Sequence, residues 1–100
     1  MTVALRSFPR AVVERVFIEF GIHLLEEFSD GQTRWGNQPL TKPYRGKSVM
    51  VQRSRGFGVP LDSYDIFSIR GIIDRLGLSG KTQQIEIRIE KVALEESEKE

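Results

Sequence analysis

The sequence predicts an α+β protein in which an antiparallel sheet is covered on one face by two helices. The prediction rests on two apolar stripes at helical spacing, within residues 10–20 and 63–76, and on four segments in which apolar and polar side chains alternate. A chain of 100 residues with 39% hydrophobic residues has room for one modest core. We therefore expect a single domain over residues 1–92, followed by a flexible acidic tail over residues 93–100.

The first elements are predicted to be a strand over residues 2–7 and a helix over residues 10–20. Pro9 suits the first turn of a helix, because its fixed φ is already helical. The apolar stripe of this helix consists of Val12, Val13, Val16, Phe17 and Phe20. Apolar residues also alternate from Val16 to Leu24, so the second strand, which we place at residues 21–28, could begin several residues earlier.

The second half of the chain is predicted to contain a strand, a helix and a last strand. After a turn at Asp30-Gly31, residues 29–46 form a long connection without a regular element, and a strand follows over residues 47–53. A helix begins at Asp62 or Ser63 and stops at Gly77. The cleanest alternation lies in residues 84–92, where Ile85, Ile87 and Ile89 are separated by Glu86, Arg88 and Glu90.

The resulting order is strand, helix, strand, strand, helix, strand. This is the split βαβ order, so we expect a ferredoxin-like sandwich with a four-stranded antiparallel sheet and two helices on one face.

Charge is distributed very unevenly along the chain. Residues 31–61 contain six basic side chains and no acid, whereas the whole chain has a formal net charge of only +1. Aromatic residues, five glycines and three prolines are interleaved with these cations. Cations neutralise phosphates and aromatic rings stack on bases, so we expect a nucleic-acid-binding site made of Arg34, Trp35, Lys42, Tyr44, Arg45, Lys47, Arg53, Arg55 and Phe57.

Two short strings resemble known nucleic-acid-binding families. Arg55-Gly56-Phe57-Gly58 resembles the start of the RNP1 motif of RNA-recognition-motif domains, but the likeness covers these four residues only. The segment from Leu76 to Thr82 resembles the turn and the start of the recognition helix in LuxR-type helix-turn-helix proteins. That resemblance would require a helix after Lys81, whereas the alternation in residues 84–92 favours a strand.

No complete catalytic or metal-binding motif is present. Gly80-Lys81-Thr82 lacks the earlier glycine of a phosphate-binding P-loop, since Arg75 stands in its place. The single histidine, His23, has no cysteine to join it in a metal site, because the chain contains none. Asp62 and Asp65 are expected to act as helix caps. We expect a protein that is not an enzyme and needs no cofactor or metal.

The leading interpretation is a small module that binds a polyanion, in the first place nucleic acid, through residues 31–61. The alternative is an interaction or assembly subunit whose long loop, residues 31–47, docks on a larger protein complex. We expect a cytoplasmic protein, without membrane partners. The outer sheet face, with His23, Leu25 and Met50, is expected to be covered by Trp35 or by a second copy in a homodimer.

Overall fold

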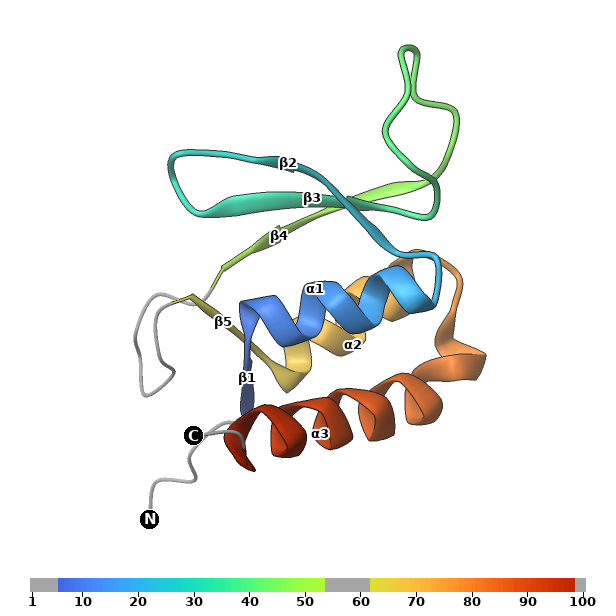
Figure 1. Ribbon diagram of the computed structural model, residues 1–100. Coiled ribbons are helices and arrows are strands. Elements are labelled where there is room, and N and C mark those ends of the chain that lie inside the picture. Colours follow the sequence, from blue (N-terminus) through green and yellow to red (C-terminus); the bar gives the residue numbers. More distant parts are fainter. Residues whose placement is uncertain (1–5, 54–61, 99–100) are drawn as a thin grey trace.

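The computed structural model describes residues 6–53 and 62–98 (Figure 1). Three helices, one short 3-10 helix and five short strands make up this part of the chain. In chain order they are β1 (Ser7–Pro9), α1 (Arg10–Glu19), β2 (His23–Glu27), β3 (Gln32–Gly36), β4 (Ser48–Gln52), β5 (Ser63–Asp65), α2 (Ile66–Arg75), the 3-10 helix η1 (Ser79–Lys81) and α3 (Thr82–Glu98).

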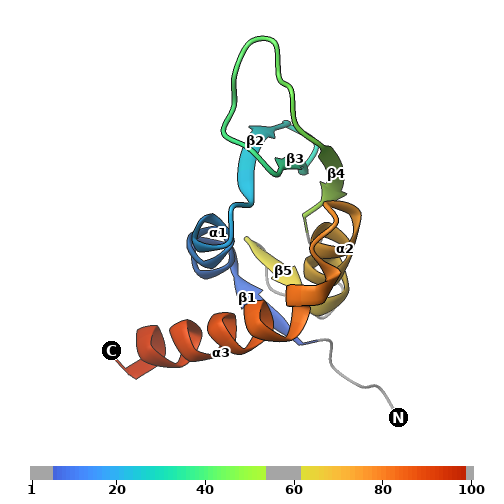
Figure 2. The same cartoon turned by 90° about the vertical axis from the view of Figure 1, so that its right-hand side faces the viewer.

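The strands form two antiparallel sheets. The larger sheet has the order β2-β3-β4, and the smaller one pairs β1 with β5. The prediction of a mixed α+β fold is therefore confirmed, but the single four-stranded sheet is wrong within the described residues. Figure 2 shows the larger sheet above α1 and α2, with the small β1–β5 ribbon and α3 below them.

Helices α1 and α2 were both predicted from their apolar stripes. Val12, Val13, Val16 and Phe17 are buried on α1, and Ile66, Ile69, Ile72 and Ile73 on α2. Helix α2 begins later than expected, because residues 63–65 pair with β1 and Asp65 is the cap, its carboxylate accepting from Ser68 N at 2.7 Å. It ends as predicted at Gly77, whose φ of +78° favours glycine.

The predicted last strand is wrong, because residues 82–98 form helix α3. Ile85, Ile89 and Val92 are fully buried, which is helical spacing, while Ile87 between them is 58% exposed. Two of the three polar residues that the strand prediction placed in one exposed row instead bond other helices. Glu86 accepts from Arg70 of α2, and Arg88 donates to Glu19 of α1 at 2.9 Å. Residues 93–98, expected as a flexible tail, are the last turns of α3.

The long connection predicted for residues 29–46 contains a strand that we did not predict. β3 is the central strand of the larger sheet, in register with β2 and β4. The predicted strand at residues 21–28 is confirmed as β2 and that at residues 47–53 as β4. Of the strand predicted at residues 2–7, residues 2–5 lie outside the described part.

The core lies between the larger sheet and the three helices. At its centre the indole of Trp35 packs edge-to-face against Phe17 and Tyr64, with ring centroids 5.2 and 5.6 Å apart. All three side chains are fully buried. In the described part of the chain, no helix has both the length and the apolar character that a membrane crossing requires.

Candidate polyanion interface

Three of the residues predicted to bind nucleic acid have another role in the structure. Trp35 is fully buried, and its indole N–H donates to Thr33 Oγ1 at 2.9 Å, so it has no free face for a base. Arg34 is paired across the β2–β3 ladder with Glu26 at 2.9 Å. Arg53 lies 3.7 Å from a carboxylate oxygen of Glu27.

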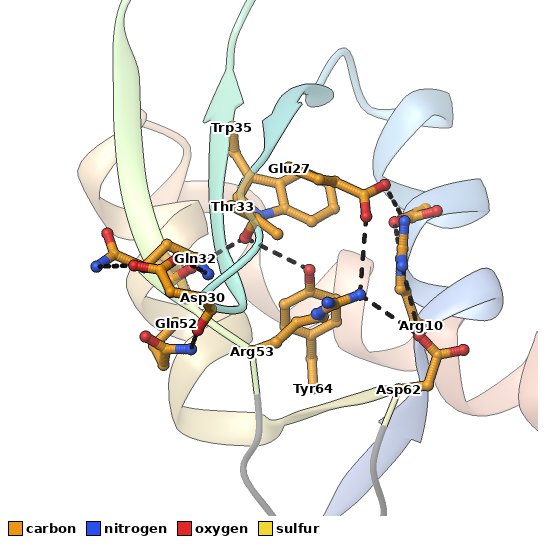
Figure 3. A network of polar contacts seen from close by, with 12 residues as sticks. Arg10, Glu27, Asp30, Gln32, Thr33, Trp35, Gln52, Arg53, Asp62 and Tyr64 are labelled. Atoms are coloured by element: carbon orange, nitrogen blue, oxygen red, sulfur yellow. Dashed lines mark hydrogen bonds and ion pairs between the residues drawn. The ribbon is translucent and has the colours of Figure 1, made fainter.

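Arg53 belongs to a charged cluster with Arg10, Glu27 and Asp62 (Figure 3). Its guanidinium also lies 3.8 Å from Asp62, and Arg10 contacts Glu14, Glu27 and Asp62. The hydrogen bond from Arg10 to Glu14, at 2.6 Å, raises the pKa of the Arg10 side chain above its ordinary range. Because these charges neutralise one another, the cluster joins strands and helix and offers little net charge to a ligand.

The remaining predicted residues divide between the loop from residue 37 to 47 and the undescribed segment. Arg55 and Phe57 lie outside the described residues. Tyr44, Lys42, Arg45 and Lys47 all lie in the loop between β3 and β4, which projects away from the helices (Figure 1).

The loop is built around the hydroxyl of Tyr44. This hydroxyl donates to Lys47 O at 2.9 Å and accepts from Gln38 N at 3.2 Å. Asn37 Oδ1 accepts from Lys47 N at 2.8 Å and closes the base of the loop. Tyr44 is thus half-buried and used structurally, which leaves it less available for stacking on a base.

Two glycines make room for the Tyr44 ring. A Cβ on Gly36 would lie 2.2 Å from the Tyr44 hydroxyl oxygen, and a Cβ on Gly46 would lie 2.6 Å from it. A Cβ atom is essentially never found within 3.0 Å of an atom to which it is not bonded, so a residue larger than glycine at either position would displace the ring. The glycines that looked like signs of irregular chain in the sequence are part of a specific loop conformation.

Three cations of the predicted site lie in this loop and have no ion-pair partner within the described residues. Lys42, Arg45 and Lys47 are exposed and form no ion pair within the described residues. Lys47 also reaches α2: its Nζ lies 3.6 Å from the position that a Cβ of Gly77 would take. The loop base therefore borders the end of α2, where a cation interacts favourably with the helix dipole.

Two further cations follow at the end of α2 and in η1, and sequence reasoning missed them. Arg75 and Lys81 are exposed, and neither has an ion-pair partner in the part of the chain that the structure describes. The nearest acids in the sequence are Asp74 for Arg75 and Glu86 for Lys81. The helical stripe in residues 66–75 could have placed Arg75 at the helix end, but only the fold brings this end beside the loop.

The structure contains the helix-turn-helix order, which the alternation in residues 84–92 had made the less favoured prediction. α2 is followed by a turn with η1 and then by α3, because the strand expected after Lys81 is wrong. The exposed side of α3 does not suit a phosphate backbone, however. It carries Glu90, Glu95 and Glu98 against Lys91, together with Ile87 and Leu94. A negative surface of this kind repels nucleic acid.

A cluster of side chains that could bind a metal is not found in the described part of the chain. No three side chains of His, Cys, Asp or Glu gather there in a way that could hold a metal ion. Tyr64 has a raised pKa because it is buried, but its hydroxyl lies 3.4 Å from Thr33 Oγ1 within the core. It is a packing residue without access for a substrate.

No family model matches this sequence, and the searches of curated proteins and of solved structures likewise give no match. The interpretation of the site therefore rests on its residues and geometry.

Proposed function

We propose that the protein binds the phosphate backbone of a nucleic acid through Lys42, Arg45 and Lys47, with Arg75 and Lys81 at the flank. The observation that carries the proposal is the combination of three exposed, unpaired cations with a loop held in place by Tyr44. A preformed loop loses little conformational entropy on binding. Cations elsewhere, by contrast, are largely occupied by carboxylates of the same chain.

The burial of Trp35 determines which kind of contact we propose. Base stacking on a single strand needs an accessible aromatic face, and Trp35 has none. Phosphate contacts need only cations. We therefore propose recognition of the backbone without sequence preference, and favour a duplex over a single strand.

The salt dependence of binding tests this proposal. If all five cations contacted duplex phosphates, the slope of log affinity against log salt would reach about −4.5, at about −0.9 per contact. Replacing both Lys42 and Arg45 with alanine should reduce the magnitude of that slope by about 1.8. Fluorescence anisotropy with a labelled duplex at several salt concentrations measures both quantities.

A matched control is the double variant Arg15→Ala and Arg70→Ala. It removes the same number of charges, but from side chains that pair with Glu96 and Glu86. Its slope should equal that of the wild type. The proposal fails if the wild type does not bind a duplex at low salt, or if the control variant loses as much affinity as the loop variant.

Docking of the loop on a partner protein is the second candidate, and Leu40 favours it. This apolar side chain is 54% exposed on the projecting loop. An exposed leucine on an ordered loop can insert into a pocket of a partner. Such binding would depend strongly on Leu40→Ser and weakly on salt, the opposite of the behaviour expected for phosphate contacts.

A further inference from the structure

Within the described residues, β4 pairs with another strand on one side only. β4 is an edge strand, paired on one side with β3. Two backbone bonds fix which residues point toward β3: Arg53 N donates to Gly31 O, and Asn37 N donates to Lys47 O. Hydrogen-bonding direction alternates along an antiparallel ladder, so residues 47, 49, 51 and 53 bond to β3, and the N–H and C=O groups of Ser48 and Met50 point outward.

A groove of about 360 Å³ follows this edge, between β4 and α2. Its lining includes Met50 from the strand and Phe67, Gly71 and Arg75 from the helix. Met50 and Phe67 are 38% and 63% exposed, which is unusual for side chains of this size. In the described part of the chain, the backbone of Met50 has no hydrogen-bond partner. The edge and the groove together form an unfilled site for another strand.

The groove has opposite charges at its two ends. Lys47 Nζ lies beside Gly77, so the start of β4 is next to the end of α2. Gln52 and Asp65 line the other end of the groove. The strand and the helix thus run in opposite directions, with cations (Lys47, Arg75) at one end and the carboxylate of Asp65 at the other.

From the rise per residue of the two elements, we infer that the middle of β4 and the middle of α2 lie at about the same level along the groove. Going from Lys47 to Met50 covers about 10 Å of strand, and going back from Gly77 to Gly71 covers about 9 Å of helix. Met50 is therefore level with Gly71, and both line the groove. A two-fold axis through this point would bring Met50 opposite Met50 and Gly71 opposite Gly71 of a second copy.

We propose that a second copy of this chain occupies the site, forming a two-fold dimer with a continuous six-stranded sheet. The two β4 edges pair antiparallel, and the Met50 residues exchange their backbone hydrogen bonds. The two α2 helices cross at Gly71, which has no Cβ to keep them apart. Phe67 of each copy then faces Arg75 of the other, a cation–π arrangement.

Charge complementarity is what favours a second copy over an unrelated strand. About the same axis, position 65 of one α2 faces position 77 of the other. Asp65 of each copy therefore approaches Lys47 of the other, because Lys47 reaches Gly77. The two-fold axis therefore creates two contacts between Lys47 and Asp65 in one dimer, and an unrelated strand would need its own matching charges to do the same. The dimer can form without nucleic acid, but it would engage Lys47 and Arg75, which also belong to the proposed phosphate site, so the two contacts would compete for these side chains. It differs from a dimer through the sheet face, where Leu25 is already buried.

The substitution Gly71→Glu tests the dimer directly. A Cβ on Gly71 meets nothing within 4 Å in the isolated chain, so the variant should fold, and glutamate is a better helix former than glycine. In the dimer, two glutamates would meet on the axis. We expect the dissociation constant of the dimer to rise about 100-fold or more, because facing like charges are strongly unfavourable. The melting temperature measured under monomeric conditions should be unchanged or higher.

Gly80→Glu is the matched control. Gly80 also has open space around it and lies in η1, outside the groove. Sedimentation equilibrium over a range of concentrations should show wild type and Gly80→Glu passing from 11.5 kDa toward twice that mass, while Gly71→Glu stays at 11.5 kDa. These measurements contain no nucleic acid, so they are independent of the proposed function.

Met50→Pro tests the strand pairing separately. Proline is tolerated on an edge strand where the N–H points to solvent, so the β3–β4 ladder should survive. The variant loses the central donor of the dimer and should be monomeric. A wild type that is monomeric at every concentration overturns the proposal. So does a Gly71→Glu variant, or a folded Met50→Pro variant, that dimerises as strongly as the wild type.

Discussion

Thr33 shows how one polar residue can organise an apolar core. It is fully buried on the central strand β3. Its hydroxyl accepts from the indole N–H of Trp35 and donates to Val51 O at 3.0 Å. Tyr64 lies within 3.4 Å of the same oxygen (Figure 3). One hydroxyl therefore satisfies the polar atoms of two large aromatic side chains that the core could not otherwise hold.

The substitution Thr33→Val should be costly although the two side chains have nearly the same shape. It leaves the indole N–H of Trp35 buried without an acceptor, which costs about 1–3 kcal/mol. Urea unfolding followed by tryptophan fluorescence measures the loss. Thr33→Ser is the control, because it keeps the hydroxyl and loses only a methyl group. If valine and serine destabilise the protein equally, the hydroxyl is not what Thr33 contributes.

At the scale of single residues, the sequence did not indicate that Trp35 is buried. Its neighbours are Arg34 and Gly36, and it stands in a stretch rich in basic residues, glycine and proline. Such surroundings are typical of an exposed aromatic residue. What buries Trp35 is the pairing of β3 with strands on both sides, and a strand of five residues with one apolar side chain shows no alternation to predict it.

Among the elements, α3 was the hardest to predict, because its pattern fits two structures. Ile85, Ile87 and Ile89 alternate with charged residues as in a strand, while Ile85, Ile89 and Val92 also mark one face of a helix. Isoleucine favours strands, so local propensity and alternation agreed with each other. The segment is nevertheless a helix, because its apolar face packs against α1 and α2. The helices α1 and α2 were predicted from their apolar stripes, although alternation from Val16 to Leu24 left the end of α1 open and α2 begins later than expected.

The loop from residue 37 to 47 is the element for which the structure adds most. The sequence indicated its basic character and its length, but not its hydrogen bonds around Tyr44. Nothing in the sequence indicated that Gly36, Tyr44 and Gly46 meet. The loop is therefore a defined structural element.

The substitution Gly46→Ala should loosen the loop without unfolding the domain. The new Cβ would lie 2.4 Å from Asn37 Oδ1 and 2.6 Å from the Tyr44 hydroxyl, so both must move. We expect a stability loss of about 1 kcal/mol and faster amide exchange at Lys47, whose N–H bonds to Asn37. Gly80→Ala is the control, since open space surrounds Gly80. Unchanged amide exchange in the Gly46→Ala variant would contradict this description of the loop.

On the scale of the whole molecule, charge is arranged differently from what composition suggested. The sequence placed six cations in one uniform basic segment. The fold divides those that it describes: Arg34 and Arg53 join ion pairs, while Lys42, Arg45 and Lys47 stay free. The carboxylates that neutralise Arg34 and Arg53 come from β2 and from the start of β5. Contacts of this kind depend on tertiary structure, so no local pattern could have indicated them.

The cluster around Arg10 links the two sheets, and Arg10→Ala should weaken that link. Arg10 contacts Glu27 at the end of β2 and Asp62 just before β5. We expect a loss of about 1–2 kcal/mol at low salt and a smaller loss at high salt, because salt screens partly exposed charges. Arg15→Ala is the control, since Arg15 is exposed and forms its ion pair with the exposed Glu96. Equal losses for both variants at low salt would show that the cluster has no special role.

The pairing of β1 with β5 also affects the order in which the molecule can assemble. Ser7 is paired with Asp65, so this two-stranded ribbon closes a loop that contains the whole of the larger sheet. The β2–β3 hairpin, by contrast, joins Glu27 to Thr33, only a few residues away. Loop-closure entropy makes the long closure about 2 kcal/mol less favourable than the short one. The hairpin can therefore form first and independently, whereas the β1–β5 ribbon becomes stable only when α1 and α2 have packed.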